Sequence, residues 1–161
     1  MKRSQLKEIL KSIIKEVLNE ASPKTTTILE FVKKYGKKYD WLLKAKTKNA
    51  KVSMGNNKKV LWKSGTWLNG TWQDGTWKDG TWKNGTWKNG TWQDGTWANG
   101  IWENGMWEGG LWKNGTWKDG EWYGGEWLNG TWLSGYWEIG QWRKGNWKAE
   151  GDAPDDSFFY Q

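Results

Sequence analysis

The chain has 161 residues and a net charge of +7, and it combines 19 Trp and 22 Gly with no Cys and no His. The lack of Cys and His excludes disulfide frameworks, His- or Cys-ligated zinc sites, and nucleophiles of either type. The mean hydropathy of −1.00 and the absence of a long apolar run exclude a membrane-spanning helix. The first residues interleave charged with apolar side chains, so we expect no secretion signal and a cytoplasmic or virion-associated protein.

Residues 1–21 are predicted to form an amphipathic helix. Their apolar residues recur three or four positions apart, which places them on one side of a helix, and Ser22-Pro23 ends the segment. The predicted apolar stripe comprises Leu6, Ile9, Leu10, Ile13, Ile14, Val17 and Leu18. We expect the stripe either to pack on the end of the repeat described below or to act as a docking arm for a protein partner or a second copy. The nearly balanced charges disfavour a membrane-surface helix, so no membrane partner is expected.

Residues 22–60 are predicted to form further short helices. Thr27 and Glu30 have the spacing of a capping box, which predicts a helix start. Gly36 is placed to end that helix, because glycine readily adopts the left-handed conformation of a helix C-terminus. Asp40 is expected to cap another short helix.

The end of this segment is predicted to cap the first coil of the repeat that follows. Apolar residues flank the turn Gly55-Asn56-Asn57 on both sides, namely Val52, Met54, Val60 and Leu61. Solenoid proteins need such end covers, because a terminal coil otherwise exposes its core.

The same segment is strongly basic, with eleven Lys against Glu30 and Asp40 in residues 22–60. Residues 24–59 are therefore a candidate nucleic-acid-binding segment with salt-dependent affinity. Its predicted phosphate contacts are Lys33, Lys34, Lys37, Lys38, Lys44, Lys46, Lys48 and Lys51. Arg is absent here and aromatic residues are few, so weak, non-specific binding is expected. The alternative is a solvated linker that binds nothing.

Residues 61–150 consist of eighteen consecutive pentads without an insertion. Position two is Trp in all eighteen, and position five is Gly in all but the last, which ends in Glu150. Thr is frequent at position one, and Asn or Asp at position four. Thr-Trp-x favours a short strand, whereas Asn-Gly and Asp-Gly favour turns. The chain is therefore predicted to turn at every pentad with Trp always on the same side.

Two architectures satisfy this pattern. In a closed coil of four pentads, about 20 residues per turn, Trp would fill the interior in four columns. In an antiparallel meander, every Trp would lie on one face. Burial favours the coil, because a monomeric meander would leave its Trp face in water. At a spacing of four pentads, opposite charges also align, as in Lys83 with Glu103 and Lys118 with Glu138.

The five-residue period resembles the pentapeptide-repeat proteins, with Trp67 as a central residue and Gly65 as the small residue two before it. The resemblance implies a right-handed, single-stranded quadrilateral β-helix. The family usually has Leu or Phe at the centre and Ala two before it. The string Trp-x-Asn-Gly also resembles part of the MORN repeat, which implies the meander. The opening Met-Lys-Arg-Ser-Gln-Leu resembles the starts of proteins from large marine tailed phages.

No arrangement of residues predicts catalysis, so no catalytic residue, cofactor or metal ligand is expected. Turn formation explains the Asp residues of the repeat. The function expected is that of a structural or interaction protein, a rigid Trp-core solenoid with a helical docking arm in a phage virion or its assembly. Nucleic-acid binding by residues 24–59 is the alternative, and an exposed Trp ladder that binds carbohydrate is the third. The tail, 151–161, is acidic and aromatic, and we expect it to cap the last coil or to act as a docking peptide.

Overall fold

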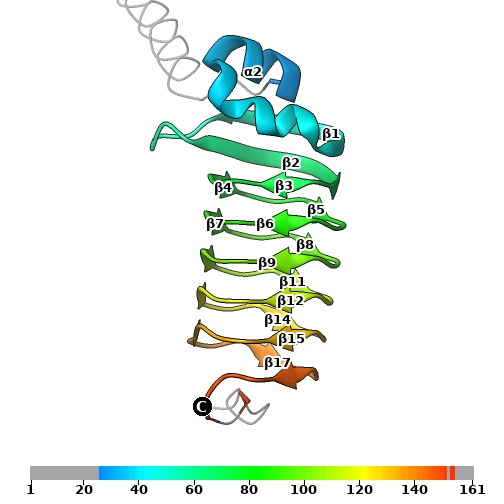
Figure 1. Ribbon diagram of the computed structural model, residues 1–161, viewed down its shortest axis with the longest axis vertical. Coiled ribbons are helices and arrows are strands. Elements are labelled where there is room, and N and C mark those ends of the chain that lie inside the picture. The colour runs from blue at the N-terminus through cyan, green and yellow to red at the C-terminus, as the bar shows by residue number, and fades with distance from the viewer. Residues whose placement is uncertain (1–25, 152, 155–161) are drawn as a thin grey trace, which may run out of the picture.

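The computed structural model describes residues 26–151, 153 and 154, which form a helical end followed by a tall stack of coils (Figure 1). The helical end contains the α-helix α2 (Ile28–Tyr35) and the 3-10 helix η1 (Lys37–Lys44). Two long strands follow, β1 (Lys46–Met54) and β2 (Val60–Asn69), and they pair as an antiparallel hairpin. Each remaining strand is very short: β3 (Thr71–Trp72), β4 (Thr76–Trp77), β5 (Thr81–Trp82), β6 (Thr86–Trp87), β7 (Thr91–Trp92), β8 (Thr96–Trp97), β9 (Ile101–Trp102), β10 (Met106–Trp107), β11 (Leu111–Trp112), β12 (Thr116–Trp117), β13 (Glu121–Trp122), β14 (Glu126–Trp127), β15 (Thr131–Trp132), β16 (Tyr136–Trp137), β17 (Gln141–Trp142) and β18 (Asn146–Trp147).

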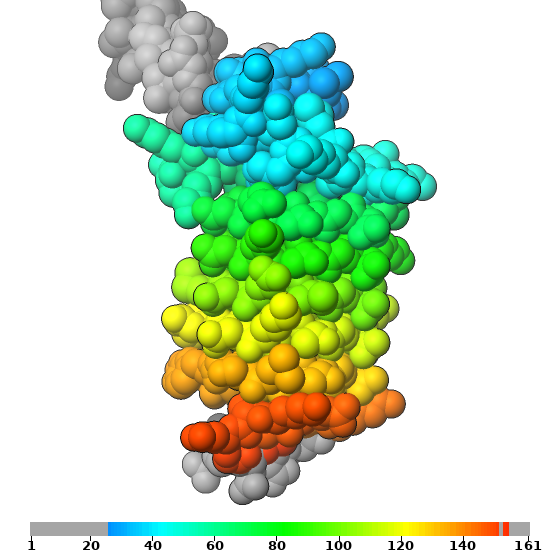
Figure 2. Space-filling model, in the orientation of Figure 1, coloured from blue at the N-terminus to red at the C-terminus, as the bar shows by residue number. Residues whose placement is uncertain are grey.

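The repeat is a β-solenoid with three sides, and each coil consists of three pentads. Strands from successive coils pair in parallel, with Trp62 opposite Trp77 and Trp72 opposite Trp87. The predicted solenoid is confirmed, and the antiparallel meander is wrong. The four-pentad, quadrilateral coil is also wrong. Figure 2 shows the coils as flat layers stacked along one axis.

Each side of the solenoid presents one column of pentads, and we name the sides by their Trp. The first face contains Trp62, Trp77, Trp92, Trp107, Trp122 and Trp137. The second face contains Trp67, Trp82, Trp97, Trp112, Trp127 and Trp142. The third face contains Trp72, Trp87, Trp102, Trp117, Trp132 and Trp147.

The size of the indole explains why three sides suffice. In the first coil Trp62, Trp67 and Trp72 meet edge to face, with ring centroids 5.8, 5.9 and 6.5 Å apart. The three rings thus touch one another across the axis, and a fourth side would open a hole at the centre. Between coils the rings lie nearly parallel, and the centroids of stacked rings are typically 4.8 Å apart. Nearly all of these Trp side chains have 0% exposure.

Charge pairing follows the three-pentad coil rather than the four-pentad spacing that the sequence favoured. Lys118 forms an ion pair with Glu103 at 3.7 Å, in the coil before it. Glu138, which the four-pentad spacing assigned to Lys118, forms no ion pair within the described residues. Surface ion pairs contribute little to stability, so they follow the coil and do not determine it.

Glycine at position five is required both by the turn and by the neighbouring coil. Gly85 has φ +122°, and a Cβ built there would lie 2.2 Å from the carbonyl oxygen of Gly70. That oxygen accepts a hydrogen bond of 2.9 Å from the backbone N–H of Thr86. Successive coils are therefore in contact through backbone atoms alone at this corner, and there is no room for a side chain.

The hairpin covers the first coil. Val52 and Val60, from its two strands, are buried in the core that continues into the solenoid. Thr27 and Glu30 form a capping box, and Gly36 ends α2. Asp40 does not cap a helix, because η1 already begins at Lys37 and has Gly36 at its N-cap.

At the opposite end, the described residues cover the core less completely. Trp137 and Trp147 are partly exposed, while Ala149 and Ala153 pack against the core. The predicted cap formed by the tail lies mostly outside the described residues, as does the predicted helix in residues 1–21. Among the residues described, no helix has the length and apolar character needed to cross a bilayer.

Candidate interaction surfaces

The first candidate surface is the cationic cap, which we define as residues 26–60. All eight Lys that the sequence marked as phosphate contacts are exposed: Lys33, Lys34, Lys37, Lys38, Lys44, Lys46, Lys48 and Lys51. They come from α2, η1 and β1, so a folded unit carries them rather than a solvated linker. The two acidic residues of the cap are Glu30, whose carboxylate accepts from the Thr27 backbone in the capping box, and Asp40.

Aromatic rings fix part of the cap. The ammonium groups of Lys34 and Lys38 lie 5.1 and 4.9 Å from the ring centroids of Tyr35 and Tyr39. The Tyr39 hydroxyl donates to the carbonyl oxygen of Lys58 at 2.9 Å and so ties η1 to the β1–β2 turn. In Figure 1 this turn projects beyond the width of the coils.

A groove of about 330 Å³ lies on the surface where the cap meets the first coil. Lys38, Lys58 and Lys59 line it together with Trp41. Lys59 forms an ion pair with Asp74 of the first coil at 2.5 Å, so its ammonium group already has an anionic partner.

The second face carries a column of asparagines at position four, formed by Asn69, Asn84, Asn99, Asn114 and Asn129. The amide nitrogen of Asn114 donates to the side-chain oxygen of Asn99 at 3.5 Å, one coil earlier. Asn or Asp at position four also accepts from the N–H of the following Gly, as Asn69 does at 2.9 Å and Asp79 at 2.6 Å. These residues form turns, as the sequence predicted.

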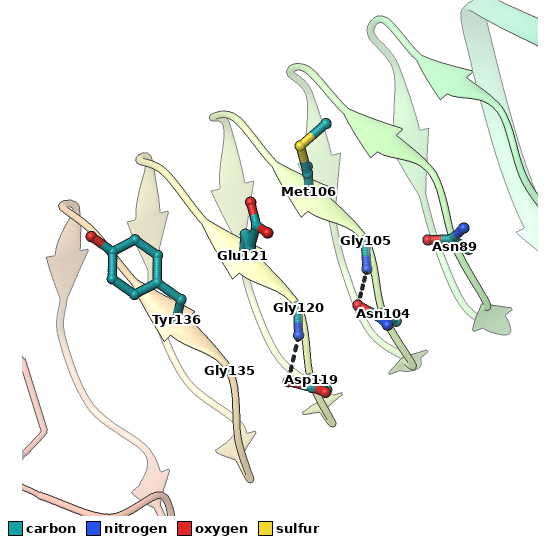
Figure 3. Close-up of a pocket in the computed structure, with 9 residues that line it drawn as sticks. All are labelled: Asn89, Asn104, Gly105, Met106, Asp119, Gly120, Glu121, Gly135 and Tyr136. Carbon is teal, nitrogen blue, oxygen red and sulfur yellow. Dashed lines mark hydrogen bonds between the residues drawn. The ribbon is translucent and has the colours of Figure 1, made fainter.

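The first face differs between its two halves, and sequence reasoning missed this. In its last three coils, positions one and three carry Met106, Glu108, Glu121, Tyr123, Tyr136 and Glu138, which we name the acidic–aromatic patch. Figure 3 shows Met106, Glu121 and Tyr136 projecting from consecutive coils. They border a shallow groove of about 460 Å³, whose other side includes Asn104 and Asp119.

Each tyrosine of the patch is hydrogen-bonded to the glutamate of its own pentad. The Tyr123 hydroxyl donates to the carboxylate of Glu121, and this hydrogen bond raises the pKa of Tyr123 above its usual range. A hydrogen bond to Glu138 likewise raises the pKa of Tyr136. Position one is Glu121 in one coil and Tyr136 in the next, whereas position three is Tyr123 and then Glu138. Carboxylates and phenols therefore alternate both within a pentad and between neighbouring coils.

The carbohydrate alternative required solvent-exposed indoles. In the described part of the solenoid the Trp columns are internal, and among the pentad indoles only Trp137 and Trp147 are partly exposed. An exposed Trp ladder on which a sugar could stack is therefore absent from these residues.

Comparisons with protein-family models, with curated proteins and with solved structures found no match to this chain. The resemblance to pentapeptide-repeat proteins thus stays a prediction.

Proposed function

We propose that this protein is a non-enzymatic structural and interaction protein, in which a rigid Trp-cored rod carries the cationic cap and a helical docking arm at one end. The observation that supports this is the unbroken core from cap to rod. Trp41 of η1 contacts Trp67 and Trp72 with ring centroids 6.5 and 5.1 Å apart. Because cap and rod share one core, a partner bound to the cap is held at a fixed position relative to the rod.

Backbone bonding gives the rod its stiffness. Successive coils are joined at each pentad by two hydrogen bonds, such as Thr86 N–H to Gly70 O and Lys88 N–H to Trp72 O, both 2.9 Å. The stiffness can be measured directly, because the chain has no Cys. Spin labels on Lys37→Cys and Lys144→Cys should give one narrow distance distribution by pulsed EPR. A broad distribution would contradict a rigid rod.

The docking arm is residues 1–21, and this part of the proposal rests on the spacing of its apolar residues. Replacing Ile13 and Ile14 by Ser should abolish association with a partner or a second copy and leave the melting temperature unchanged. Replacing Lys11 and Lys15 by Ser, on the polar side of the predicted helix, is the matched control. A fall in melting temperature without a change in oligomer mass would mean that the helix is merely a cap.

The resemblance of the first residues to tailed-phage proteins supports placing this rod in a virion or its assembly. Mass spectrometry of purified particles tests that placement, because a virion component is recovered in a fixed ratio to the major capsid protein. Recovery only from the lysate would favour an assembly factor.

A second candidate function is binding of nucleic acid through the cationic cap, which the exposure of all eight predicted lysines favours. Binding to labelled single- and double-stranded DNA should be weak, indifferent to sequence and steeply reduced by salt. Changing Lys37, Lys44 and Lys48 to Gln should weaken binding and flatten its salt dependence. The matched control changes Lys83, Lys88 and Lys113 of the rod. Equal losses in both variants would contradict a specific role for the cap.

A further inference from the structure

We propose that the acidic–aromatic patch is a docking surface for an arginine-rich segment of a protein partner. The inference rests on the proposed function, because it names a partner chemistry for a second site on the rod. It is carried by the charge, the exposure and the backbone of the last three coils of the first face.

All charged residues of the patch are acidic. Glu108, Glu121 and Glu138 occupy it without any basic residue at positions one, three or four of these three pentads. In the part of the chain that the structure describes, none of the three forms an ion pair. The nearby bases Lys118 and Arg143 are engaged elsewhere, with Glu103 and Glu126.

The patch also exposes large side chains that the fold does not need there. Tyr136 is 56% exposed, Met106 40% and Tyr123 38%, whereas earlier pentads of the same face carry Thr76 and Thr91 at position one. Aromatic rings and a thioether that are exposed to water do not stabilise the rod. Aromatic residues and Met are enriched in protein–protein interfaces.

Two glycines keep the surface beside these side chains open. Gly109 and Gly124 stand at position four, where the same face has Asp79 and Asp94 in earlier coils. Neither has a positive φ, and a Cβ would meet its nearest neighbour at 3.4 Å and 3.3 Å. The backbone dihedral therefore does not demand glycine at either position, unlike Gly85, and a Cβ at Gly124 would be in tight contact with the carbonyl oxygen of Glu108. Position four therefore contributes no side chain next to Glu108 and Tyr123.

Arginine matches this surface better than other cations. Its planar guanidinium can stack on a phenol ring while it forks a carboxylate, and both groups alternate across the patch. A metal ion is a poorer fit, because the described residues contain no group of three carboxylates that could hold one. The cationic cap of a second copy is also a poorer fit, since residues 26–60 contain Lys but no Arg.

The test is binding of fluorescent octa-arginine and octa-lysine peptides to the full chain, followed by anisotropy. We expect octa-arginine to bind more tightly than octa-lysine. The patch variant changes Glu108, Glu121 and Glu138 to Gln, and it should weaken octa-arginine binding about tenfold, in line with a few exposed charge pairs. The matched control changes Asp40, Asp79 and Asp94 to Asn, which leaves the Lys118–Glu103 ion pair intact. It removes the same charge from other sites and should change the affinity by less than about twofold.

A second variant separates this docking surface from simple charge attraction. Replacing Tyr123 and Tyr136 by Ser leaves the net charge unchanged and should still weaken octa-arginine binding several-fold through lost stacking. Equal losses in patch and control variants, or no effect of the tyrosine changes, would overturn the proposal. Salt-sensitive dimers that the glutamate changes dissolve would identify a second copy as the occupant and would also overturn it. The arm variants at Ile13 and Ile14 should bind the peptide normally, so failure here is distinguishable from failure of the docking arm.

Discussion

The indole of Trp41 meets that of Trp72 edge to face, with ring centroids 5.1 Å apart and planes at 84°. Within the rod, indoles in successive coils are instead stacked nearly parallel, as Trp72 and Trp87 are at 6°. Trp41 therefore continues the core without continuing the repeat. Its perpendicular ring offers no parallel platform above Trp72, and together with the pairing of β1 with β2 it ends the solenoid on the side of the cap.

Trp41→Ala should destabilise the protein by roughly 2–3 kcal/mol, because it removes a partly buried ring and exposes the end of the third face. Denaturant unfolding measures the loss. Leu43→Ala is the control, since this exposed side chain of the same helix should cost little. A similar cost for both would mean that Trp41 has no special part in capping.

Trp97→Ala should cost about 3–5 kcal/mol, because a fully buried ring with stacked neighbours on both sides leaves a cavity. Trp147→Ala, in the last coil, should cost clearly less, since its ring is partly exposed and stacks on Trp132 alone. Unfolding in guanidinium, followed by fluorescence, compares the two variants.

The tryptophan emission of the native protein should be blue-shifted and poorly quenched by acrylamide, because nearly all the indoles are buried. Red-shifted emission from a folded monomer would contradict the closed coil.

Gly85→Ala should be severely destabilising, because its Cβ would lie 2.2 Å from a backbone oxygen at a positive φ. Gly109→Ala should be neutral or slightly stabilising, since its φ is not positive and the nearest atom to a Cβ is 3.4 Å away. Melting temperatures of the two variants provide the comparison. Equal destabilisation would refute the argument that position five alone needs glycine.

The three-pentad coil predicts which introduced cysteines can pair. Ala98 and Lys113 occupy equivalent positions in adjacent coils, where Cα atoms are about 4.8 Å apart and within the range of a disulfide. Ala98→Cys with Lys113→Cys should therefore oxidise readily. Ala98→Cys with Lys118→Cys, at the four-pentad spacing, should stay reduced under the same oxidant. Non-reducing electrophoresis separates the cross-linked chains. Efficient pairing at the four-pentad spacing would refute the three-sided coil.

The solenoid followed directly from the pentads, but the number of sides did not. Almost every pentad has the same Trp and Gly, so the core residues do not reveal which pentads are neighbours. The information lay at position four. Asparagine recurs at every third pentad along the second face, and Gly109 and Gly124 are also three pentads apart. The weak charge pairs at four pentads pointed the other way, and they carry too little energy to select a coil.

The acidic–aromatic patch was hidden for the same reason. Glu121 and Tyr136 are separated by three pentads and look unrelated until the coil places them side by side. With an assumed coil of four pentads, each would have been assigned to a different side. The Lys residues of the cap needed no such register, because their number in a short segment was enough to predict an exposed basic surface.

Position five is Gly in all pentads but the last, and position two is always Trp. The residues that form the core therefore do not restrict which residues the surface positions carry. The place of a pentad within its group of three specifies its column, and its place in the chain specifies its height. Inserting or deleting a whole coil would move every later surface by one step along the axis while each column kept its side. Removing a single pentad would instead turn everything after it to the next side. The chain can therefore be lengthened or rotated by copying the stretch of its gene that encodes one coil or one pentad, and the spacing between the cationic cap and the acidic–aromatic patch becomes a heritable length in steps of one coil.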